Sequence, residues 1–111
     1  MQVMLLIAIT FLVIIIAILL SRGRVYRISP NTYRYVEAID ACHKKYRGRL
    51  ATVDEVKSAY NYGADWCGIG WADGMNGIYA SQADRHESGC QKGVHYRRLP
   101  GQLKLGAYCW S

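Results

Sequence analysis

The stretch GADWCGIGWADG (Gly63–Gly74) decides how this chain folds, because it sets two tryptophans around a cysteine between repeated glycines. Glycines at this density break a helix, and the tryptophans make the stretch too apolar for an ordinary linker. Three arrangements would explain Cys67: half of a metal site, the loop of a thiol nucleophile, or one end of a structural disulfide beside a core aromatic. The other cysteines and the surrounding segments decide among them.

The four cysteines of the chain contain no CxxC pair, and they are Cys42, Cys67, Cys90 and Cys109. Without that paired spacing a zinc site has little support, although His43, His86 and His95 could add nitrogen ligands. We therefore predict no metal site. An even cysteine count in a small domain favours two disulfides, each typically contributing about 2–4 kcal/mol. Four cysteines allow three pairings, and the spacing alone leaves all of them open.

Residues 3–20, VMLLIAITFLVIIIAILL, form an uncharged run in which only Thr10 is polar. Its length is close to the roughly 20 apolar residues that span a bilayer, so we predict a single transmembrane helix with the membrane as its partner. A cleavable signal peptide is the alternative. However, the run is longer than the usual apolar core of about 7–15 residues, no basic residue precedes it, and no small-x-small site follows. The predicted organisation is an anchor over residues 1–21 and one domain over residues 22–111.

Every formal charge follows Ser21, so the net charge of +6 belongs to the domain. A basic surface attracts polyanions such as acidic glycans, lipid headgroups or acidic proteins. The basic residues are scattered and form no nucleic-acid motif, so we predict no nucleic-acid partner. We also predict no cofactor and no enzymatic activity. No phosphate loop or Ser/His/acid set is present, and Cys42 and His43 lie about 100° apart on a helix, unable to pair as nucleophile and base.

Two amphipathic helices are predicted ahead of the tryptophan-containing stretch. Apolar residues recur at three- and four-residue steps over Tyr35–Tyr46, which predicts a helix that Gly48 ends. In TVDE, Thr52 and Glu55 can form a capping box that starts a second helix over about Val53–Asn61.

The remaining regular segments are predicted to be strands. RVYRI (24–28) alternates bulky and charged residues like a strand, and the turn residues of SPNT (29–32) then interrupt it. Short glycine-punctuated runs at 77–80, 93–99 and 105–110 predict further strands and loops. Two helices followed by a small sheet indicate an α+β fold.

Several motifs occur in one characteristic order: YRYVEAIDAC, GRLATVDEV, YGADWCGIGWADG, IYA and GAYCW. In order and spacing they resemble the Link module, a hyaluronan-binding relative of the C-type lectin-like fold, over about residues 24–110. The resemblance implies two helices, small antiparallel sheets and two disulfides, Cys42 with Cys109 and Cys67 with Cys90. Cys67 would then fasten a glycine turn, and Trp71 would pack beneath it in the core rather than act as a stacking platform for sugar.

The resemblance also implies a groove for an anionic glycan of the hyaluronan class. Aromatic rings in such a groove stack on the sugar, while Arg and Lys meet its carboxylates. The residues expected to contact the ligand are Tyr79, Tyr96, Arg97 and Arg98. The chain departs from the family at Asn31, where a binding tyrosine is expected, and at Pro30, where a basic residue is expected. The CQKG segment (90–93) is shorter than the family's loop and lacks its aromatic residue.

Two functions fit these features. The first is a single-pass, membrane-anchored Link-like binding module at the cell surface. The second is a non-enzymatic structural virion protein of a large DNA virus, a minor capsid or inner-membrane component that contacts neighbouring capsid proteins. Arg22, Arg24 and Arg27 follow the apolar run and favour a cytosolic domain by the positive-inside rule, whereas disulfides need oxidising surroundings. A virus-encoded thiol oxidation pathway would reconcile the two.

Overall fold

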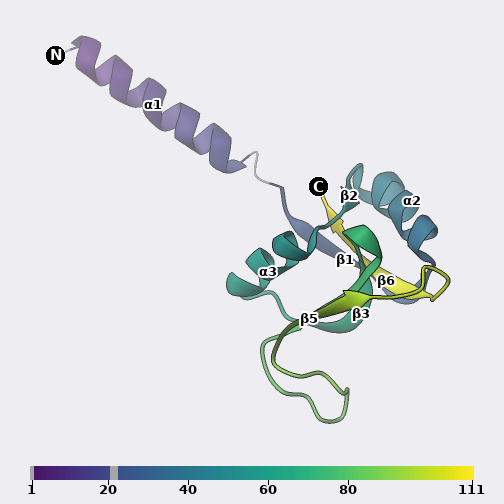
Figure 1. The fold of residues 1–111 in the computed structure, drawn as a ribbon. Coiled ribbons are helices and arrows are strands. Elements are labelled where there is room, and N and C mark those ends of the chain that lie inside the picture. The colour runs from purple at the N-terminus through teal and green to yellow at the C-terminus, as the bar shows by residue number, and fades with distance from the viewer. Residues whose placement is uncertain (1, 21–22) are drawn as a thin grey trace.

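The computed structural model describes residues 2–20 and 23–111, and Figure 1 shows how their helices and strands are arranged. The described helices are α1 (Gln2–Leu20), α2 (Tyr35–Tyr46) and α3 (Val53–Asn61). The described strands are β1 (Val25–Tyr33), β2 (Arg49–Leu50), β3 (Trp66–Ala72), β4 (Asn76–Ser81), β5 (Gly93–Arg98) and β6 (Leu105–Trp110), with a short 3-10 turn, η1 (Asp73–Met75), after β3. The predicted α+β class is confirmed.

Helix α1 forms where the apolar run predicts a helix, and its described side chains are exposed. Among the residues that the structure describes, no helix is both long enough and apolar enough to cross a membrane. The prediction of a transmembrane anchor over residues 3–20 is not supported. The boundary predicted between residues 21 and 22 lies outside the described residues.

Helices α2 and α3 form over the predicted residues. At the start of α3 the capping box is present: the Glu55 amide donates to Thr52 Oγ1 at 3.1 Å, and the Thr52 amide donates to Glu55 Oε1 at 2.9 Å. At the end of α2 the left-handed residue is Arg47, with φ 53°, and not Gly48. Gly48 is required for another reason, since a Cβ there would overlap the carbonyl oxygen of Trp110.

The strands form one six-stranded sheet in the order β1-β6-β3-β4-β5, with β2 also paired to β6. Neighbouring strands are antiparallel except β3 and β6, which are parallel. This corrects the expectation of small antiparallel sheets and of a glycine turn at Cys67, because the tryptophan-containing stretch is the central strand β3. Its Gly70 permits close packing: a Cβ there would lie 2.7 Å from Cε2 of Tyr108.

Strand β1 continues through the residues predicted to form a turn. It pairs with β6 from Val25 to Ile28 and again at Tyr33, with a register irregularity between Ile28 and Tyr33. The turn residues are therefore accommodated by an irregularity in the strand pairing, which does not end the strand.

Helices α2 and α3 pack on opposite faces of the sheet. Successive residues of a strand face opposite sides, and along β6 Ala107 and Cys109 join the core cluster beside α2, whereas Tyr108 joins the cluster beside α3. The disulfide Cys42–Cys109 covalently links α2 to β6. The sheet is thus covered on both faces, and its β4–β5 end remains as an open edge.

Trp71 in β3 is fully buried in the α2-side core. Its indole Nε1–H donates to the carbonyl oxygen of Tyr33 at 2.9 Å, and its ring meets Tyr35 edge-on, with centroids 5.4 Å apart. The predicted core role of Trp71 is confirmed, and the ring is closed to any ligand.

Candidate functional site

The four predicted ligand residues lie on the hairpin formed by β4 and β5, at the edge of the sheet. Tyr79 pairs with His95, and Gly77 pairs with Arg97. Directly opposite residues of an antiparallel pair point to the same face, and the rings of Tyr79 and His95 are 5.2 Å apart. Tyr79 and Arg97 therefore share one face of the hairpin with His95.

Tyr96 and Arg98 point to the opposite face, because side chains alternate along a strand. Tyr96 pairs with Ile78, which is buried in the α3-side core. The ammonium of Lys57 in α3 lies 5.1 Å from the centre of the Tyr96 ring. The structure thus brings Tyr79 and Arg97 together and separates them from Arg98 and from the ring of Tyr96.

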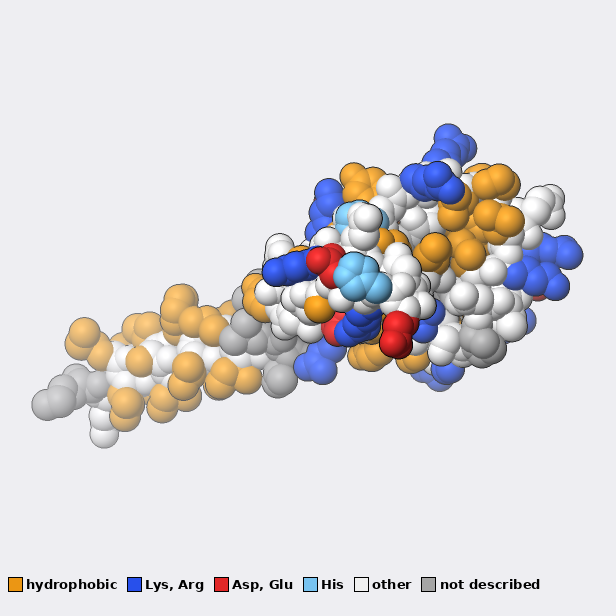
Figure 2. All heavy atoms as spheres, turned by 90° about the horizontal axis from the view of Figure 1, so that it is seen from below, with side chains coloured by type: hydrophobic (Ala, Val, Ile, Leu, Met, Phe, Trp, Pro, Cys, Tyr) orange, Lys and Arg blue, Asp and Glu red, His pale blue; other side chains and the backbone are white. Residues whose placement is uncertain are grey.

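A groove of about 300 Å³ lies along the hairpin, lined by Ile69, Gly77, Tyr79, His95, Tyr96, Arg97 and Leu99. Gly77 forms its floor, since a Cβ there would overlap Cδ1 of Leu99. Figure 2 views the domain from the end where the loop between β4 and β5 lies, and it shows apolar patches with lysine and arginine side chains around them. The groove combines an aromatic ring, an apolar floor and a guanidinium.

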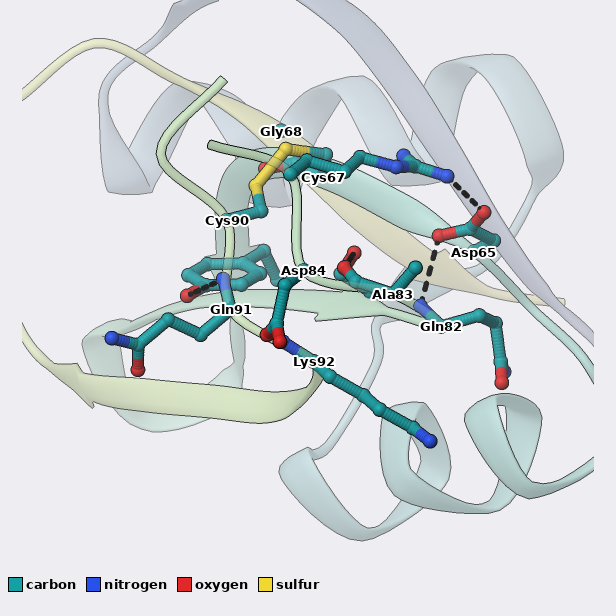
Figure 3. Close-up of a disulfide and its surroundings, with 12 residues drawn as sticks. Asp65, Cys67, Gly68, Gln82, Ala83, Asp84, Cys90, Gln91 and Lys92 are labelled. Atoms are coloured by element: carbon teal, nitrogen blue, oxygen red, sulfur yellow. Dashed lines mark hydrogen bonds and ion pairs between the residues drawn. A yellow bond between two sulfur atoms is a disulfide. The ribbon is translucent and has the colours of Figure 1, made fainter. Parts of the chain in front are cut away.

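The Tyr79 hydroxyl is held by the loop that follows β4. The Gln91 amide donates to Tyr79 Oη at 3.1 Å, and this bond appears as a dashed line in Figure 3. Nε2 of His95 lies 3.0 Å from the carbonyl oxygen of Lys92. The loop therefore fixes both rings that line the groove.

The loop is itself anchored at two points, one in β3 and one at Asp65, the residue that precedes this strand. The disulfide Cys67–Cys90 joins its end to the strand. At its start, the Asp65 carboxylate accepts a hydrogen bond from the Gln82 amide at 3.1 Å and forms an ion pair with Arg85. A disulfide and an ion pair thus hold the loop that contacts Tyr79 and His95 in the groove.

All four cysteines are disulfide-bonded. The pairs are those that the Link resemblance implies, so Cys67 is neither a thiol nucleophile nor a zinc ligand. Within the described ranges, no three His, Cys, Asp or Glu side chains come together in a way that could hold a metal ion.

A larger hollow, of about 720 Å³, lies away from the hairpin, between α3 and the ends of β1 and β6. Trp66 and Trp110 are in its wall, and so is Glu55. Burial alone would raise the pKa of Glu55, but hydrogen bonds from Arg49 and from the Thr52 amide hold it below its usual range. Both carboxylate oxygens of Glu55 bind Arg49, at 2.7 and 2.9 Å. No predicted ligand residue lines this hollow, so we place the candidate site at the hairpin.

Sequence reasoning missed His95 and Ile69 as groove residues. His95 was considered only as a metal ligand, yet the two-residue alternation in GVHYRRL places His95 with Arg97 and separates both from Tyr96. Ile69 could not be predicted as a groove residue, because the strand that contains it was expected to be a turn.

A family model described as an extracellular link domain matches residues 24–110. The matched range runs from the start of β1 to the end of β6 and contains both disulfides and the hairpin groove. Link domains are binding modules, and the match suggests a glycan of the hyaluronan type as ligand and an extracellular or surface location. With most of its length inside the match, this chain belongs to the extracellular Link domain family.

Proposed function

We propose that the domain binds an anionic glycan of the hyaluronan class in the hairpin groove, with Tyr79 and Arg97 as the principal contacts. The observation that supports this is the placement of an aromatic ring, an apolar floor and a guanidinium on one face of the hairpin. A pyranose ring stacks its apolar face on an aromatic side chain. A guanidinium binds a carboxylate through two parallel hydrogen bonds.

Arg97 is free to make that contact. It is exposed, and none of the described carboxylates forms an ion pair with it. The ring of His95 lies against that of Tyr79, tilted by 33°, and limits the positions that the Tyr79 ring can adopt. The groove is therefore ordered before the ligand arrives, which reduces the entropy cost of binding.

Tyr96 and Arg98 have a secondary place in this proposal. β5 is the last strand of the sheet order, so a polysaccharide can pass around this edge and meet both faces of the hairpin. Tyr96 and Arg98 then contact a long ligand and add little to the binding of a short one.

The test is a titration of the full chain with a hyaluronan decasaccharide, followed by calorimetry at moderate salt. Tyr79→Ala should weaken binding by about 1–2 kcal/mol, roughly 5- to 30-fold, as for loss of a ring that anchors a ligand. Tyr79→Phe is the matched control: it keeps the ring, loses only the hydrogen bond from Gln91, and should bind nearly as well as the parent. Equal affinities of the parent and Tyr79→Ala, or no binding by the folded and oxidised parent, would contradict the proposal.

The alternative role as a structural virion protein gains no support from any described residue. Neighbouring capsid proteins and a membrane therefore have no part in the proposed function.

A further inference from the structure

Strand β5 is the last strand of the sheet, and its outer edge is unpaired. The strand order ends at β5, and within the described part of the chain β5 pairs with β4 alone. It is six residues long. An edge strand presents a row of N–H and C=O groups that can pair with another chain.

The pairing with β4 determines which backbone groups point to this open edge. The Leu99 amide donates to the Met75 carbonyl oxygen at 3.0 Å. Opposite residues of antiparallel strands alternate between pairs that exchange hydrogen bonds and pairs that do not. In the observed register, His95 and Arg97 therefore direct their backbone groups to β4. The residues of β5 that direct their backbone groups outward are Val94, Tyr96 and Arg98.

These three outward residues offer their backbone to a further strand. Among the described residues, no backbone hydrogen bond beyond the β4 pairing involves any of them. Proteins bind extended peptides at such an edge, where main-chain hydrogen bonds supply affinity and the alternating side chains supply specificity. The chemistry of the side chains beside β5 therefore indicates which segment the edge prefers.

Three cations flank the edge without an acidic partner. Arg97 lies on the Tyr79 face of the hairpin. Arg98 lies on the opposite face, where the Lys57 ammonium is 5.1 Å from the centre of the Tyr96 ring. All three cationic side chains are exposed, and none of the ion pairs between described residues includes them. A segment added at this edge thus meets positive charge on both faces of the sheet.

The same charges disfavour a second copy of this chain as the added strand. In a symmetric pairing of two β5 strands, the arginines of one copy would lie opposite or diagonal to those of the other. Like charges in opposite positions destabilise a strand pair, and charged residues on an edge strand are a common protection against self-pairing. Carboxylates in those positions would be attracted instead, so the charges select an acidic partner.

We propose that the outer edge of β5 binds an extended acidic segment of a partner protein, which adds a strand to the sheet. The backbone of the segment bonds to Val94, Tyr96 and Arg98. Its glutamate or aspartate side chains meet Arg97 on one face, and Arg98 and Lys57 on the other. The proposal goes beyond glycan binding and does not rest on it, because the edge binds through its backbone.

The test is a calorimetric titration of the full chain with the acetylated octapeptide amide EVEEVEEV and with N-methylated forms of it. A strand has two hydrogen-bonding edges, formed by alternate residues. N-methylation of one alternate set leaves one edge intact, so the affinity should stay within about threefold of that of the unmodified peptide. N-methylation of both sets keeps the charge but should weaken binding about 10-fold or more. Equal binding of all forms, or no binding of the unmodified peptide, would overturn the proposal.

Hydrogen exchange at individual amides locates the bound peptide. At saturation the amides of Tyr96 and Arg98 should exchange about 10-fold more slowly, because they then donate to the peptide. The amides of His95 and Arg97, already directed to β4, should change less. Slowing that is absent from Tyr96 and Arg98 would overturn the proposal.

Side-chain variants separate the peptide site from the glycan groove. Lys57→Gln should weaken peptide binding roughly 2- to 5-fold, as for loss of an exposed ion pair, and should leave binding of the hyaluronan decasaccharide unchanged. Lys45→Gln is the matched control: Lys45 is exposed in the last turn of α2, and its loss should affect neither ligand.

The same variants distinguish the possible failures. Equal weakening of peptide binding by Lys57→Gln and Lys45→Gln would show attraction to net charge alone and would overturn the edge site. Peptide binding by a folded parent that binds no decasaccharide would contradict the glycan function and support this inference. Decasaccharide binding without peptide binding would do the reverse.

Discussion

The centre of the sheet and its β4–β5 edge both contain aromatic residues and a disulfide, but these residues have different roles in the two places. At the centre, Trp71 is fully buried, and the disulfide Cys42–Cys109 joins two buried cysteines. At the edge, Tyr79 is half-buried in an open groove, and the second disulfide, Cys67–Cys90, holds a surface loop. The aromatic ring at the centre is fully buried by its neighbours, whereas the Tyr79 ring at the edge remains partly exposed and can contact a ligand.

The physical reason for this difference is the number of neighbouring layers. Both faces of the central strands are covered by α2 and α3, but the Tyr79 face of the hairpin has neither helix on it. Changes at the centre should therefore lower stability, and changes at the edge should lower binding with a smaller effect on stability. The following predictions test that separation.

The largest effect is expected for Trp71→Ala. Removing a fully buried indole leaves a cavity and an unpaired carbonyl at Tyr33, so the free energy of unfolding should fall by about 3–5 kcal/mol. Tyr79→Ala removes a half-buried ring and should lower it by about 1 kcal/mol or less. Urea denaturation of the oxidised chain measures both values. Equal losses for the two variants would mean that the hairpin is as much a part of the core as β3.

A smaller loss of stability is expected when glycine is replaced by alanine at Gly70, in the centre of the sheet, or at Gly77, at its edge. In Gly70→Ala the new Cβ would lie 2.7 Å from the Tyr108 ring and 3.2 Å from the Gly106 carbonyl carbon, and neither can move easily. We expect a loss of about 1–3 kcal/mol in the free energy of unfolding. In Gly77→Ala the overlap is with the end of the flexible Leu99 side chain, so the loss should stay below about 1 kcal/mol.

The two glycine variants should show the reverse order in binding. Gly77→Ala raises the floor of the groove, so its affinity for the hyaluronan decasaccharide should fall, while folded Gly70→Ala should bind like the parent. The measurement is the same calorimetric titration used for Tyr79→Ala. Impaired binding by Gly70→Ala alone would place the ligand away from the hairpin.

The glycines also explain which parts of the fold could be predicted from the sequence. Helices α2 and α3 were predictable because their signals are local: a three- to four-residue apolar period and a capping box at Thr52. Strand β3 was not, since its glycines were interpreted as turn formers. Gly70 is instead required by a ring from β6, and the partners Gly70 and Tyr108 are far apart in the sequence.

The arrangement of the predicted site residues could not be predicted for a related reason. Tyr79, Tyr96, Arg97 and Arg98 were correctly placed on neighbouring strands, but the residues that share a face depend on the β4–β5 register. The alternation in β5 separates the side chain of Tyr96 from that of Arg97, yet only the pairing of Tyr79 with His95 shows that the Arg97 side chain lies on the Tyr79 face of the hairpin.

The smallest effect is expected from the pH dependence of Tyr108, at the centre of the sheet. Burial raises the pKa of Tyr108 to about 12, although the charge and hydrogen bonding of Arg27 act in the opposite direction. In the unfolded chain the hydroxyl ionises near pH 10. Between these values the unfolded chain has lost this proton and the folded chain has kept it. The contribution of Tyr108 to stability is therefore complete below pH 10 and is lost as the pH rises towards 12, by about 1.4 kcal/mol at pH 11.

Tyr108→Phe should remove that part of the alkaline slope. At pH 7 the variant loses the hydrogen bonds of the Tyr108 hydroxyl to the Gly68 carbonyl and to Arg27, which costs about 1–2 kcal/mol, so the stabilities of parent and variant should converge between pH 7 and pH 11. Urea denaturation at pH 7, 9 and 11 measures the difference. If the difference stayed constant over this range, the Tyr108 hydroxyl would have the same pKa in the folded and unfolded chains. Tyr108 would then be accessible to solvent in the native state, and the division between a closed centre and an open edge would not hold at β6.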